Sequence, residues 1–491
     1  MTMKPSEVIN VLMKGVDCWD LPTNEVPCEL LLIGEAAFPV LVNRQGQVLI
    51  AVSQYGKGRM VVMGHESYLQ YTGLTPFLNN AVGWLKGCRG DVIGVHSSAK
   101  DLASILCSPC HEVQITDCID NSLGVYCISA CGTTEAKELI HFVKNGGGLL
   151  IGCQAWQWAN EQCQGKVLSD FPGNHITSVA GVYFTDTYGY INCLEVSRKV
   201  PTIPLIVRFG QDLSQDQKQL LDGISELSFS LTGVPSQLLV HGALAFPLGL
   251  DKSLGCFLAA ARYGRGRVVL ASHQDMLWDP NLSHFLCNAV CWLAGDRQGK
   301  GKVGINPEVK DLCPLLSDCC LEHCIVPHVS DDLSVYCCQA FQDDEAKQLL
   351  EFVAEGGGLL IGGEAWSWAH DNPCGIALVD YPGNHILNHF GLSILDQTLE
   401  KSCFPVLCPE EKIYHLRLAL HEVLEEPVCQ GGCLVGTCLE KLKKDHETFK
   451  MMPVREIPAY ASLKYFFRKF ETKVDPLKLE MPIVPVHPMC D

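Results

Sequence analysis

Histidine-glutamate pairs are the residues from which a zinc peptidase could be built, and the chain contains four of them. They begin at positions 65, 111, 421 and 446. A zincin places two histidines one helical turn apart with the glutamate between them, so that both imidazoles reach one metal ion. The fourth position after each histidine is occupied here by Leu69, Ile115, Glu425 and Lys450. Because no pair extends to HExxH, we predict that the chain is not a zincin.

Cys153 is the nearest candidate for a catalytic nucleophile, because it directly follows a glycine-rich apolar run. A nucleophile elbow needs small residues on both sides of its serine or cysteine. Neither GxSxG nor GxCxG occurs in the chain, and the position that repeats Cys153 is Gly363. We therefore favour a buried thiol at Cys153 and predict no catalytic residue.

Two pairs of histidines occupy matched positions in the two halves of the chain. His65 corresponds to His273, 208 residues later, and His175 corresponds to His385, 210 residues later. A repeated histidine is a better candidate for a polar site than a lone one. Both copies of a duplicated unit inherit the same packing requirements, however, so we favour structural roles for all four.

Two tryptophan pairs are also repeated. Trp156 and Trp158 correspond to Trp366 and Trp368. Residues two apart do not face the same side of a helix. We therefore expect one tryptophan of each pair in the core and the other exposed, where it would serve as a contact anchor.

Cysteines gather in three regions and raise the question of a metal site. The regions hold Cys107, Cys110 and Cys118; Cys313, Cys319, Cys320 and Cys324 with His323 and His328; and Cys429, Cys433 and Cys438. A structural zinc site needs four well-placed ligands. The CxxC pair is not repeated, because the matching positions 317 and 320 hold serine and cysteine. We predict neither a metal nor a cofactor.

The elements that position these residues come from a long internal repeat. Residues 141–152 read HFVKNGGGLLIG and residues 351–362 read EFVAEGGGLLIG, which agree at nine of twelve positions. Matched residues continue for most of the first 400 positions, at offsets of 208 and then 210. Such a repeat indicates tandem related domains. We predict domains at 1–205 and 206–400, followed by a separate segment at 401–491.

Each repeat has the pattern of an α/β domain. Ala136, Leu139, Ile140 and Val143 form one apolar helix stripe within a predicted helix at 133–145. Gly146 stands where a left-handed residue ends a helix, and an apolar strand follows. Phosphate loops follow a strand and open a helix, whereas these glycines close a helix. We therefore favour a helix stop with close packing over ligand binding.

The segment after about residue 400 has a different character. Helices are predicted at 412–426 and 434–448, and Leu463, Phe466, Phe467 and Phe470 share one face of a third. Ten Lys and Arg against five Asp and Glu between 441 and 478 make it basic. This face could lie on a membrane or dock on a partner, but we favour the amphipathic start of a third domain.

Bulk composition excludes several classes of protein. A net charge of −18 argues against nucleic-acid binding, because phosphate contacts need basic surface. The first twenty residues lack the apolar core of a signal peptide, and no run of eighteen apolar residues occurs. These features predict a reducing cytoplasmic location, in which the 27 cysteines would be largely free thiols.

Several stretches resemble the TRP channel-associated factors (TCAF family). They are CELLLIGEAAFPVLVNRQGQVLIAVSQYGKGRMVV, FVKNGGGLLIGCQAWQWA, SVAGVYFTDTYG, PSQLLVHGALAFPLGLD, AARYGRGRVVL and FVAEGGGLLIG. The resemblance runs over about residues 1–400 and continues into the tail through Ile457-Pro-Ala-Tyr. It is far more specific than any single motif above.

The resemblance implies an accessory protein of a melastatin-type TRP channel that senses cold and menthol. Members of the family are expected to regulate channel delivery to the cell surface, channel gating and cell migration from the cytoplasmic side of the plasma membrane. The implied fold is a tandem flavodoxin-type, class I glutamine amidotransferase-like α/β domain followed by a partial α+β third domain. Longer members continue into a peptidase-like module, whereas this sequence stops at Asp491.

These lines of reasoning converge on a non-enzymatic adaptor that binds the channel and associates peripherally with the membrane through it. Two alternatives stay open. One is a divergent hydrolase that uses Cys153 or the repeated histidines, and the other is a small-ligand-binding module. The sequence does not fix the oligomeric state.

Overall fold

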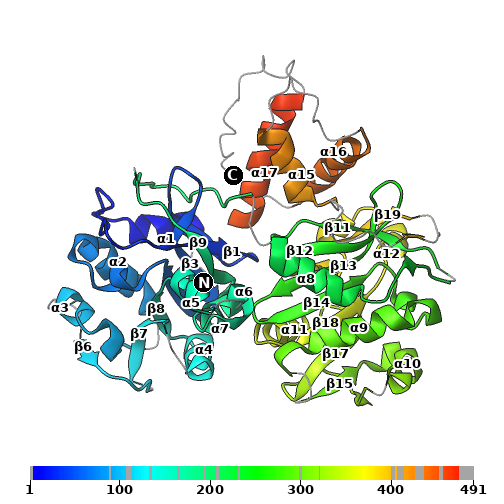
Figure 1. Ribbon diagram of the computed structural model, residues 1–491, viewed down its shortest axis with the longest axis horizontal. Helices are drawn as coiled ribbons and strands as arrows, with labels where there is room; N and C mark the ends of the chain where they lie inside the picture. The colour runs from blue at the N-terminus through cyan, green and yellow to red at the C-terminus, as the bar shows by residue number, and fades with distance from the viewer. Residues whose placement is uncertain are drawn as a thin grey trace.

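A computed structural model describes most of the chain as two lobes and a helical group. It describes residues 4–87, 90–106, 112–120, 122–131, 135–162, 166–192, 194–205, 210–230, 233–297, 301–319, 321–399, 404–405, 414–425, 436–452 and 457–474. Figure 1 shows the N-terminal lobe in blue and cyan beside a second lobe in green and yellow. The orange and red helices lie above the seam between the lobes (Figure 1).

The first lobe is built on a seven-stranded mixed sheet in the order β2-β3-β4-β8-β7-β5-β6, with β1 and β9 paired separately. Its strands are β1 (Cys28–Leu32), β2 (Phe38–Val42), β3 (Val48–Tyr55), β4 (Gly58–Met63), β5 (Val92–Val95), β6 (Glu112–Ile115), β7 (Leu123–Ser129), β8 (Gly148–Gly152) and β9 (Val182–Tyr188). Its helices are α1 (Pro5–Leu12), α2 (Thr75–Leu85), α3 (Leu102–Leu106), α4 (Ala136–Lys144), α5 (Ala155–Glu161), α6 (Val167–Asp170) and α7 (Asn174–Thr177).

The second lobe repeats this strand order. Its sheet runs β16-β15-β17-β18-β14-β13-β11-β19, and β12 pairs with β13. The strands are β11 (Ser236–Val240), β12 (Ala245–Leu250), β13 (Cys256–Tyr263), β14 (Gly266–Ala271), β15 (Lys302–Ile305), β16 (His323–Ile325), β17 (Leu333–Gln339), β18 (Gly358–Gly362) and β19 (Leu392–Thr398). The helices are α8 (Gly210–Leu220), α9 (Ser283–Ala294), α10 (Cys313–Asp318), α11 (Ala346–Ala354), α12 (Trp366–Asp371), α13 (Ala377–Asp380) and α14 (Asn384–Leu387). The α/β class predicted from the sequence is confirmed.

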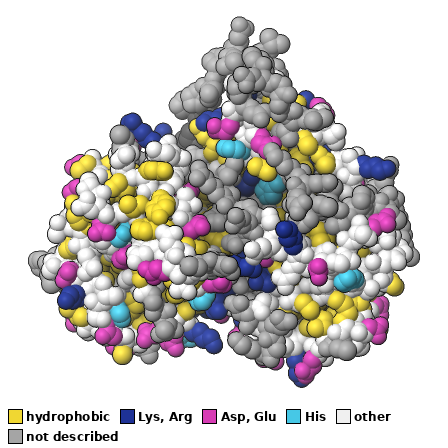
Figure 2. Space-filling view, viewed as in Figure 1, with side chains coloured by type: hydrophobic (Ala, Val, Ile, Leu, Met, Phe, Trp, Pro, Cys, Tyr) yellow, Lys and Arg dark blue, Asp and Glu magenta, His cyan; other side chains and the backbone are white. Residues whose placement is uncertain are grey.

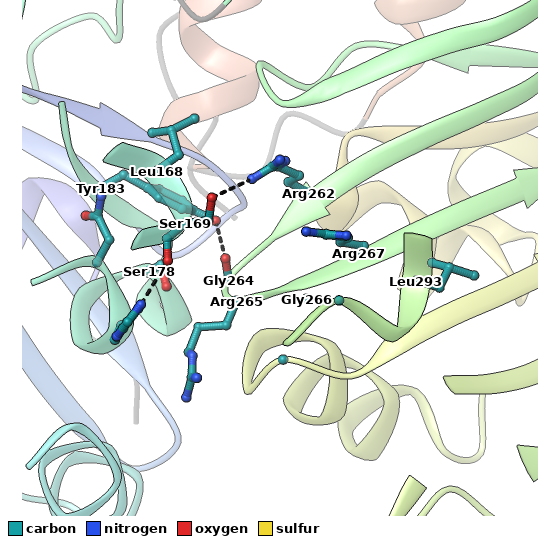
Figure 3. A pocket seen from close by; sticks show the side chains of 14 residues that line it. Leu168, Ser169, Ser178, Tyr183, Arg262, Gly264, Arg265, Gly266, Arg267 and Leu293 are labelled. Carbon is teal, nitrogen blue, oxygen red and sulfur yellow. Dashed lines mark hydrogen bonds between the residues drawn. The ribbon is translucent and has the colours of Figure 1, made fainter. Parts of the chain in front are cut away.

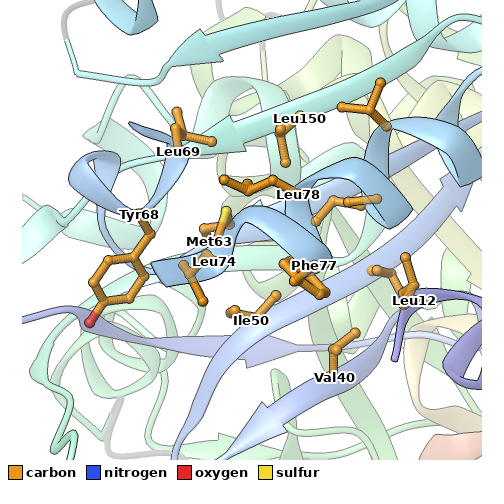
Figure 4. Packing of buried hydrophobic residues seen from close by; sticks show 14 of the residues in the cluster. Leu12, Val40, Ile50, Met63, Tyr68, Leu69, Leu74, Phe77, Leu78 and Leu150 are labelled. Atoms are coloured by element: carbon orange, nitrogen blue, oxygen red, sulfur yellow. The ribbon is translucent and has the colours of Figure 1, made fainter. Parts of the chain in front are cut away.

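Both faces of each sheet are covered. Along β8, Leu150 joins one hydrophobic core while Leu149 and Ile151 join the core on the opposite face. This follows from the two-residue period of a strand, which sends successive side chains to opposite faces. Figure 4 shows the first of these cores, where Leu12 of α1 and Phe77 of α2 pack near the sheet.

The repeated glycines end a helix and begin a strand, as the sequence predicts. Gly146 and Gly356 have φ of 104° and 108°, a region that favours glycine. The Gly147 N–H then donates to the Phe142 carbonyl at 3.0 Å, which closes the end of α4. A Cβ on Gly148 would collide with the backbone of Leu85. The glycine run therefore serves chain reversal and close packing. The helix predicted at 133–145 is α4, which begins at Ala136. Positions 132–134 lie outside the described residues.

The C-terminal group consists of α15 (Leu416–Glu425), α16 (Gly436–Lys450) and α17 (Pro458–Val474), which agree with the predicted helices. Leu463, Phe467 and Phe470 are buried and Phe466 is partly buried, so the predicted apolar face of α17 is confirmed. They share one core with Leu378 and other residues of the second lobe. Before these helices, β20 (Phe404–Pro405) pairs with β10 (Glu226–Leu227). No helix of the described residues has the length and apolar character needed to cross a membrane.

Candidate functional site

The carboxyl edge of the parallel strands is where α/β sheets usually bind ligands, at a point where the strand order reverses. In the first lobe β6, β5, β7 and β8 are parallel neighbours, so the order reverses beside β5. Four residues lie within two positions of the strand ends at this edge: His65 after β4, His96 after β5, Cys131 after β7 and Cys153 after β8. These are the residues to test for an assembled site.

Cys153 does not have the free thiol that the sequence predicts. It forms a disulfide with Cys131, and the two Cα atoms are 5.9 Å apart. Both sulfurs are engaged with each other, so the cluster of Glu66, Cys131 and Cys153 offers no set of free metal ligands. This pair could not be predicted from local patterns, because 22 residues separate the cysteines and only the fold brings β7 and β8 together.

A second disulfide, between Cys287 and Cys319, also contradicts the prediction of free thiols. Other cysteines agree with it. Cys28, Cys127 and Cys337 are buried free thiols, and burial raises the pKa of Cys28 to about 12. Such thiols stay protonated at neutral pH and are poor nucleophiles.

His65 and His273 have the structural role that the repeat predicts. The His65 Nδ1 accepts a hydrogen bond from the Ser67 N–H at 3.1 Å, and the His273 Nδ1 accepts one from the Asp275 N–H at 3.1 Å. Each imidazole thereby caps a short 3-10 helix. Burial lowers the pKa of His65, which favours the neutral ring that this acceptor role needs.

His175 and His385 do not share one role, although they occupy matched positions. The His175 Nε2 donates to the Ser169 carbonyl at 2.8 Å, beside a cavity between the lobes. The His385 Nδ1 lies 2.6 Å from the Asp343 Oδ2 on the exposed surface. The repeat therefore preserves the residue type at this position but not its partner.

Glu364 is a polar residue that the motif search missed. It is the second residue after β18, is 8% exposed, and its Oε2 lacks a hydrogen-bond partner among the described residues. The Oε2 lies 3.9 Å from the His273 Nε2. Burial, reinforced by the charge of Asp275, raises the pKa of Glu364 to about 7. The first-lobe counterpart of Glu364 is Gln154. This difference between the two repeats is the feature of the sequence that could have indicated Glu364.

The remaining cysteine clusters assemble no metal site among the described residues. Cys107, Cys110, Cys320, Cys429 and Cys433 lie outside the described residues. Cys313, Cys324 and Cys438 are half-buried free thiols, and Cys118 is exposed.

Potential metal ligands also meet at His446, Glu447 and Glu471. Lys450 lies 2.6 Å from Glu447 and 2.9 Å from Glu471, and these carboxylates raise its pKa. The ammonium group therefore already pairs with both carboxylates and offsets one of their two negative charges.

The tryptophans contradict the expectation of one core and one exposed ring. All four are half-buried. The Trp156 ring lies 4.9 Å from the Tyr188 ring, and its Nε1 donates to the Val26 carbonyl at 2.9 Å. Trp158 meets Phe171 edge to face. The reason is that α5 is short and lies against β9, so both rings find partners along its flanks.

Exposed side chains continue from Trp156 and its contact Tyr188 along the chain to Tyr190. Tyr188 is 48% exposed, Tyr190 is 56% exposed, and Val26 is 38% exposed. The name aromatic patch is used below for Val26, Trp156, Tyr188 and Tyr190. In the second lobe the Trp366 Nε1 repeats the bond to the Val234 carbonyl, but the position matching Tyr188 is Thr398. The patch is therefore specific to the first lobe.

A polar cavity lies between the two lobes. It is lined by Ser169, His175, Ser178 and Tyr183 of the first lobe and by Arg262, Gly264, Arg265 and Arg267 of the second. The Tyr183 hydroxyl donates to the Gly264 carbonyl at 2.7 Å, and the Arg262 Nη1 donates to the Ser169 Oγ at 3.4 Å. Figure 3 shows these bonds and the position of Arg265 on the hairpin. Figure 2 shows Lys and Arg side chains along the same seam.

Comparison with known proteins identifies the family. The family TCAF_N, described as "TRPM8, N-terminal domain", matches residues 2–170 and 162–409. The chain belongs to this family. It is 59% identical to human TRPM8 channel-associated factor 2 over 93% of the chain and 50% of that protein. It is 49% identical to bovine TRPM8 channel-associated factor 1 over 95% of the chain and 50% of that protein. The resemblance seen in the sequence is thereby confirmed.

The chain spans about half the length of the curated TCAF relatives that it matches. Among solved structures, the metallopeptidase IMPa from Pseudomonas aeruginosa, bound to an O-glycopeptide, is 12% identical with a TM-score of 0.37. That similarity covers 52% of this chain and 34% of the IMPa chain. It is too weak to carry an argument about fold or activity.

Proposed function

We propose that this TCAF chain is a non-enzymatic accessory protein that binds the melastatin-type channel TRPM8. The observation that carries the proposal is membership of a family whose curated members are named TRPM8 channel-associated factors. Regulation of channel delivery to the cell surface, of gating and of cell migration belongs to the same proposal. So does a cytoplasmic location, with peripheral association to the plasma membrane through the channel.

The geometry of the carboxyl edge supports an accessory role over a hydrolytic one. Cys153 is held in a disulfide, and its counterpart Gly363 has no side chain. His65 and His273 use one ring nitrogen to cap a helix. A nucleophile needs an adjacent base within hydrogen-bond reach, and these residues supply none.

We also propose that residues 1–205 and 206–400 are two domains of the flavodoxin-type, class I glutamine amidotransferase-like fold. Two observations support this division. The order β6-β5-β7-β8 reads 2-1-3-4 in chain order, as in flavodoxin-like sheets, and β16-β15-β17-β18 repeats it. Residues 401–491 would form the start of the following peptidase-like module, as the resemblance implies.

The aromatic patch is the surface that we assign to the channel contact. Tyrosine and tryptophan dominate the energetics of protein interfaces, because they bury a large apolar ring and retain a polar group. Trp156 is fixed by its bond to Val26 and by the Tyr188 ring, so little side-chain freedom remains to be lost when a partner binds.

Co-precipitation of the chain with TRPM8 from cells, together with surface biotinylation of the channel, tests the proposal. We expect the chain to capture the channel and to change the amount of channel at the surface. Replacing both Tyr188 and Tyr190 by serine should abolish capture. Ile115→Ser is the matched control, because Ile115 is 60% exposed on the edge strand β6, outside the patch. Capture that survives loss of both tyrosines would refute the assigned surface; no capture by the unaltered chain would refute the function.

A further inference from the structure

We propose that the cavity between the lobes binds a small oxyanion of the phosphate class. The site is separate from the aromatic patch and does not depend on the channel-binding role. It would bring together one hydroxyl from the first lobe and one guanidinium from the second. The key residues are Ser178 and Arg265, which both line the cavity and each have a buried polar atom without a hydrogen-bond partner among the described residues.

Arg265 offers a hydrogen-bond donor that the described residues leave unused. Its Nε is buried and has no hydrogen-bond partner among the described residues. The side chain leaves the hairpin between β13 and β14, as Figure 3 shows, and lines the cavity. An unpaired buried donor costs free energy, more so when the group is charged. A guanidinium in this position is suited to an oxyanion, whose oxygens accept two parallel hydrogen bonds.

Ser178 offers a second unsatisfied group on the opposite wall. It is 2% exposed, lines the cavity, and its Oγ has no hydrogen-bond partner among the described residues. The matching residue of the second lobe, Asn388, is fully engaged. Its Nδ2 donates to the Leu378 carbonyl at 3.0 Å, and its Oδ1 accepts from the Ser393 hydroxyl at 2.6 Å. The polar group at this repeated position is therefore structural in one lobe and unsatisfied in the other.

The charge around the cavity favours an anion. Arg262, Arg265 and Arg267 all line it, and no carboxylate is among the described lining residues. Arg262 is neutralised by Asp216, whose oxygens lie 2.5 and 2.7 Å from its Nε and Nη2. Among the described residues, Arg265 forms no hydrogen bond or ion pair with an acidic side chain. Its positive charge is therefore available to a ligand.

The size of the cavity selects a small ligand. Its free volume is about 30 Å³, which corresponds to about two ordered waters. That room suits a group of a few heavy atoms, such as a phosphate ion, better than a nucleotide or a sugar. Because the ion would contact Ser178 from one lobe and Arg265 from the other, it would link the two lobes.

Thermal unfolding of the full chain in increasing inorganic phosphate, at constant ionic strength set with chloride, tests the site. A ligand that binds only the folded state raises the midpoint in proportion to the logarithm of its concentration. We expect such a shift in the unaltered chain. Arg265→Gln and Ser178→Ala should each weaken the apparent affinity at least about tenfold, since each removes one hydrogen bond to a charged ligand.

Two controls distinguish a specific site from the general stabilisation that phosphate gives any protein. Lys57→Gln alters the position that matches Arg265 in the first lobe, is exposed, and should leave the shift unchanged. Ser178→Ala removes only an unpartnered hydroxyl, so its midpoint without phosphate should equal or exceed that of the unaltered chain. An equal shift in all variants would overturn the proposal.

A phosphate could also be presented on a lipid headgroup rather than free in solution. Sedimentation with vesicles that contain phosphatidylinositol phosphates distinguishes the two sources. We expect no sedimentation that depends on Arg265. If the chain sedimented with the vesicles only when Arg265 is present, and its unfolding midpoint did not respond to inorganic phosphate, the assignment of a small free ion would be overturned.

Discussion

Replacing Asp216 by valine should strongly destabilise the second lobe. Asp216 lies on α8 and is 1% exposed. It accepts hydrogen bonds from the Arg262 Nε at 2.5 Å, the Arg262 Nη2 at 2.7 Å and the Trp292 Nε1 at 3.0 Å. Valine removes both acceptor oxygens, and with them all three hydrogen bonds, and leaves the Arg262 guanidinium, 7% exposed, without the Asp216 counter-charge.

The magnitude follows from the burial of the pair. Removing one partner of a buried ion pair costs about 3–5 kcal/mol, because the remaining charge is left uncompensated. For a cooperative unit of about 150–250 residues each kcal/mol lowers the unfolding midpoint by about 2–4 °C. The expected loss for Asp216→Val is therefore about 6–20 °C in the transition of the second lobe.

The first lobe provides the control. At the matching positions it has Val8 in place of Asp216 and Gln54 in place of Arg262. The tryptophan is the same in both lobes, since Trp84 matches Trp292. Replacing a buried ion pair by a neutral pair of similar volume is often close to neutral. The double variant Asp216→Val/Arg262→Gln should therefore recover more than half of the loss.

Scanning calorimetry of the unaltered chain and the two variants measures these midpoints. If the unfolding midpoint of Asp216→Val lay within about 2 °C of that of the unaltered chain, the ion pair would contribute little to stability. That result would contradict the cost expected of an uncompensated buried charge. A double variant no more stable than the single one would show that the loss arises from something other than the unpaired arginine. Either result would refute the reasoning.

Two further predictions concern the second lobe and its hairpin. Since the pKa of Glu364 is raised from 4.5 to about 7, the folded state holds this proton more tightly than the unfolded state. Its contribution to stability is present at acid pH and is lost as pH rises from about 4.5 to 7, with a slope below about 1.4 kcal/mol per pH unit. Midpoints measured across that range should fall more steeply for the unaltered chain than for Glu364→Gln, and equal slopes would contradict the assignment. Gly264→Ala combines a φ of 59° with a collision against the Ala354 carbonyl, whereas Gly15→Ala has a φ of 69° and open space. Both incur about 1–2 kcal/mol of backbone strain, so urea denaturation should show a clearly larger loss for Gly264→Ala.

Local patterns predicted much of the fold. The apolar stripe that begins at Ala136, the left-handed Gly146 and the buried strand after it all follow from nearest-neighbour sterics and side-chain periodicity. The apolar face of α17 follows in the same way. These features depend on residues a few positions apart, and the structure confirms them.

The site features depended on contacts between distant residues, and there the sequence was less informative. The partner of Cys153 lies on a neighbouring strand, so the disulfide appears only when β7 and β8 pair. Trp156 and Trp158 are both half-buried because α5 lies against β9, which helix periodicity alone does not describe. The unsatisfied atoms of Ser178 and Arg265 belong to residues of different lobes that line one cavity. Comparing the repeats position by position would have indicated Glu364, because Gln154 stands in its place.

Direct binding between the purified chain and purified TRPM8 in detergent, measured by biolayer interferometry, tests the central claim. We expect saturable binding that is lost when Tyr188 and Tyr190 are both replaced by serine and is retained in Ile115→Ser. Absence of binding by a chain whose calorimetric unfolding shows it to be folded would contradict the claim that these residues suffice to associate with the channel.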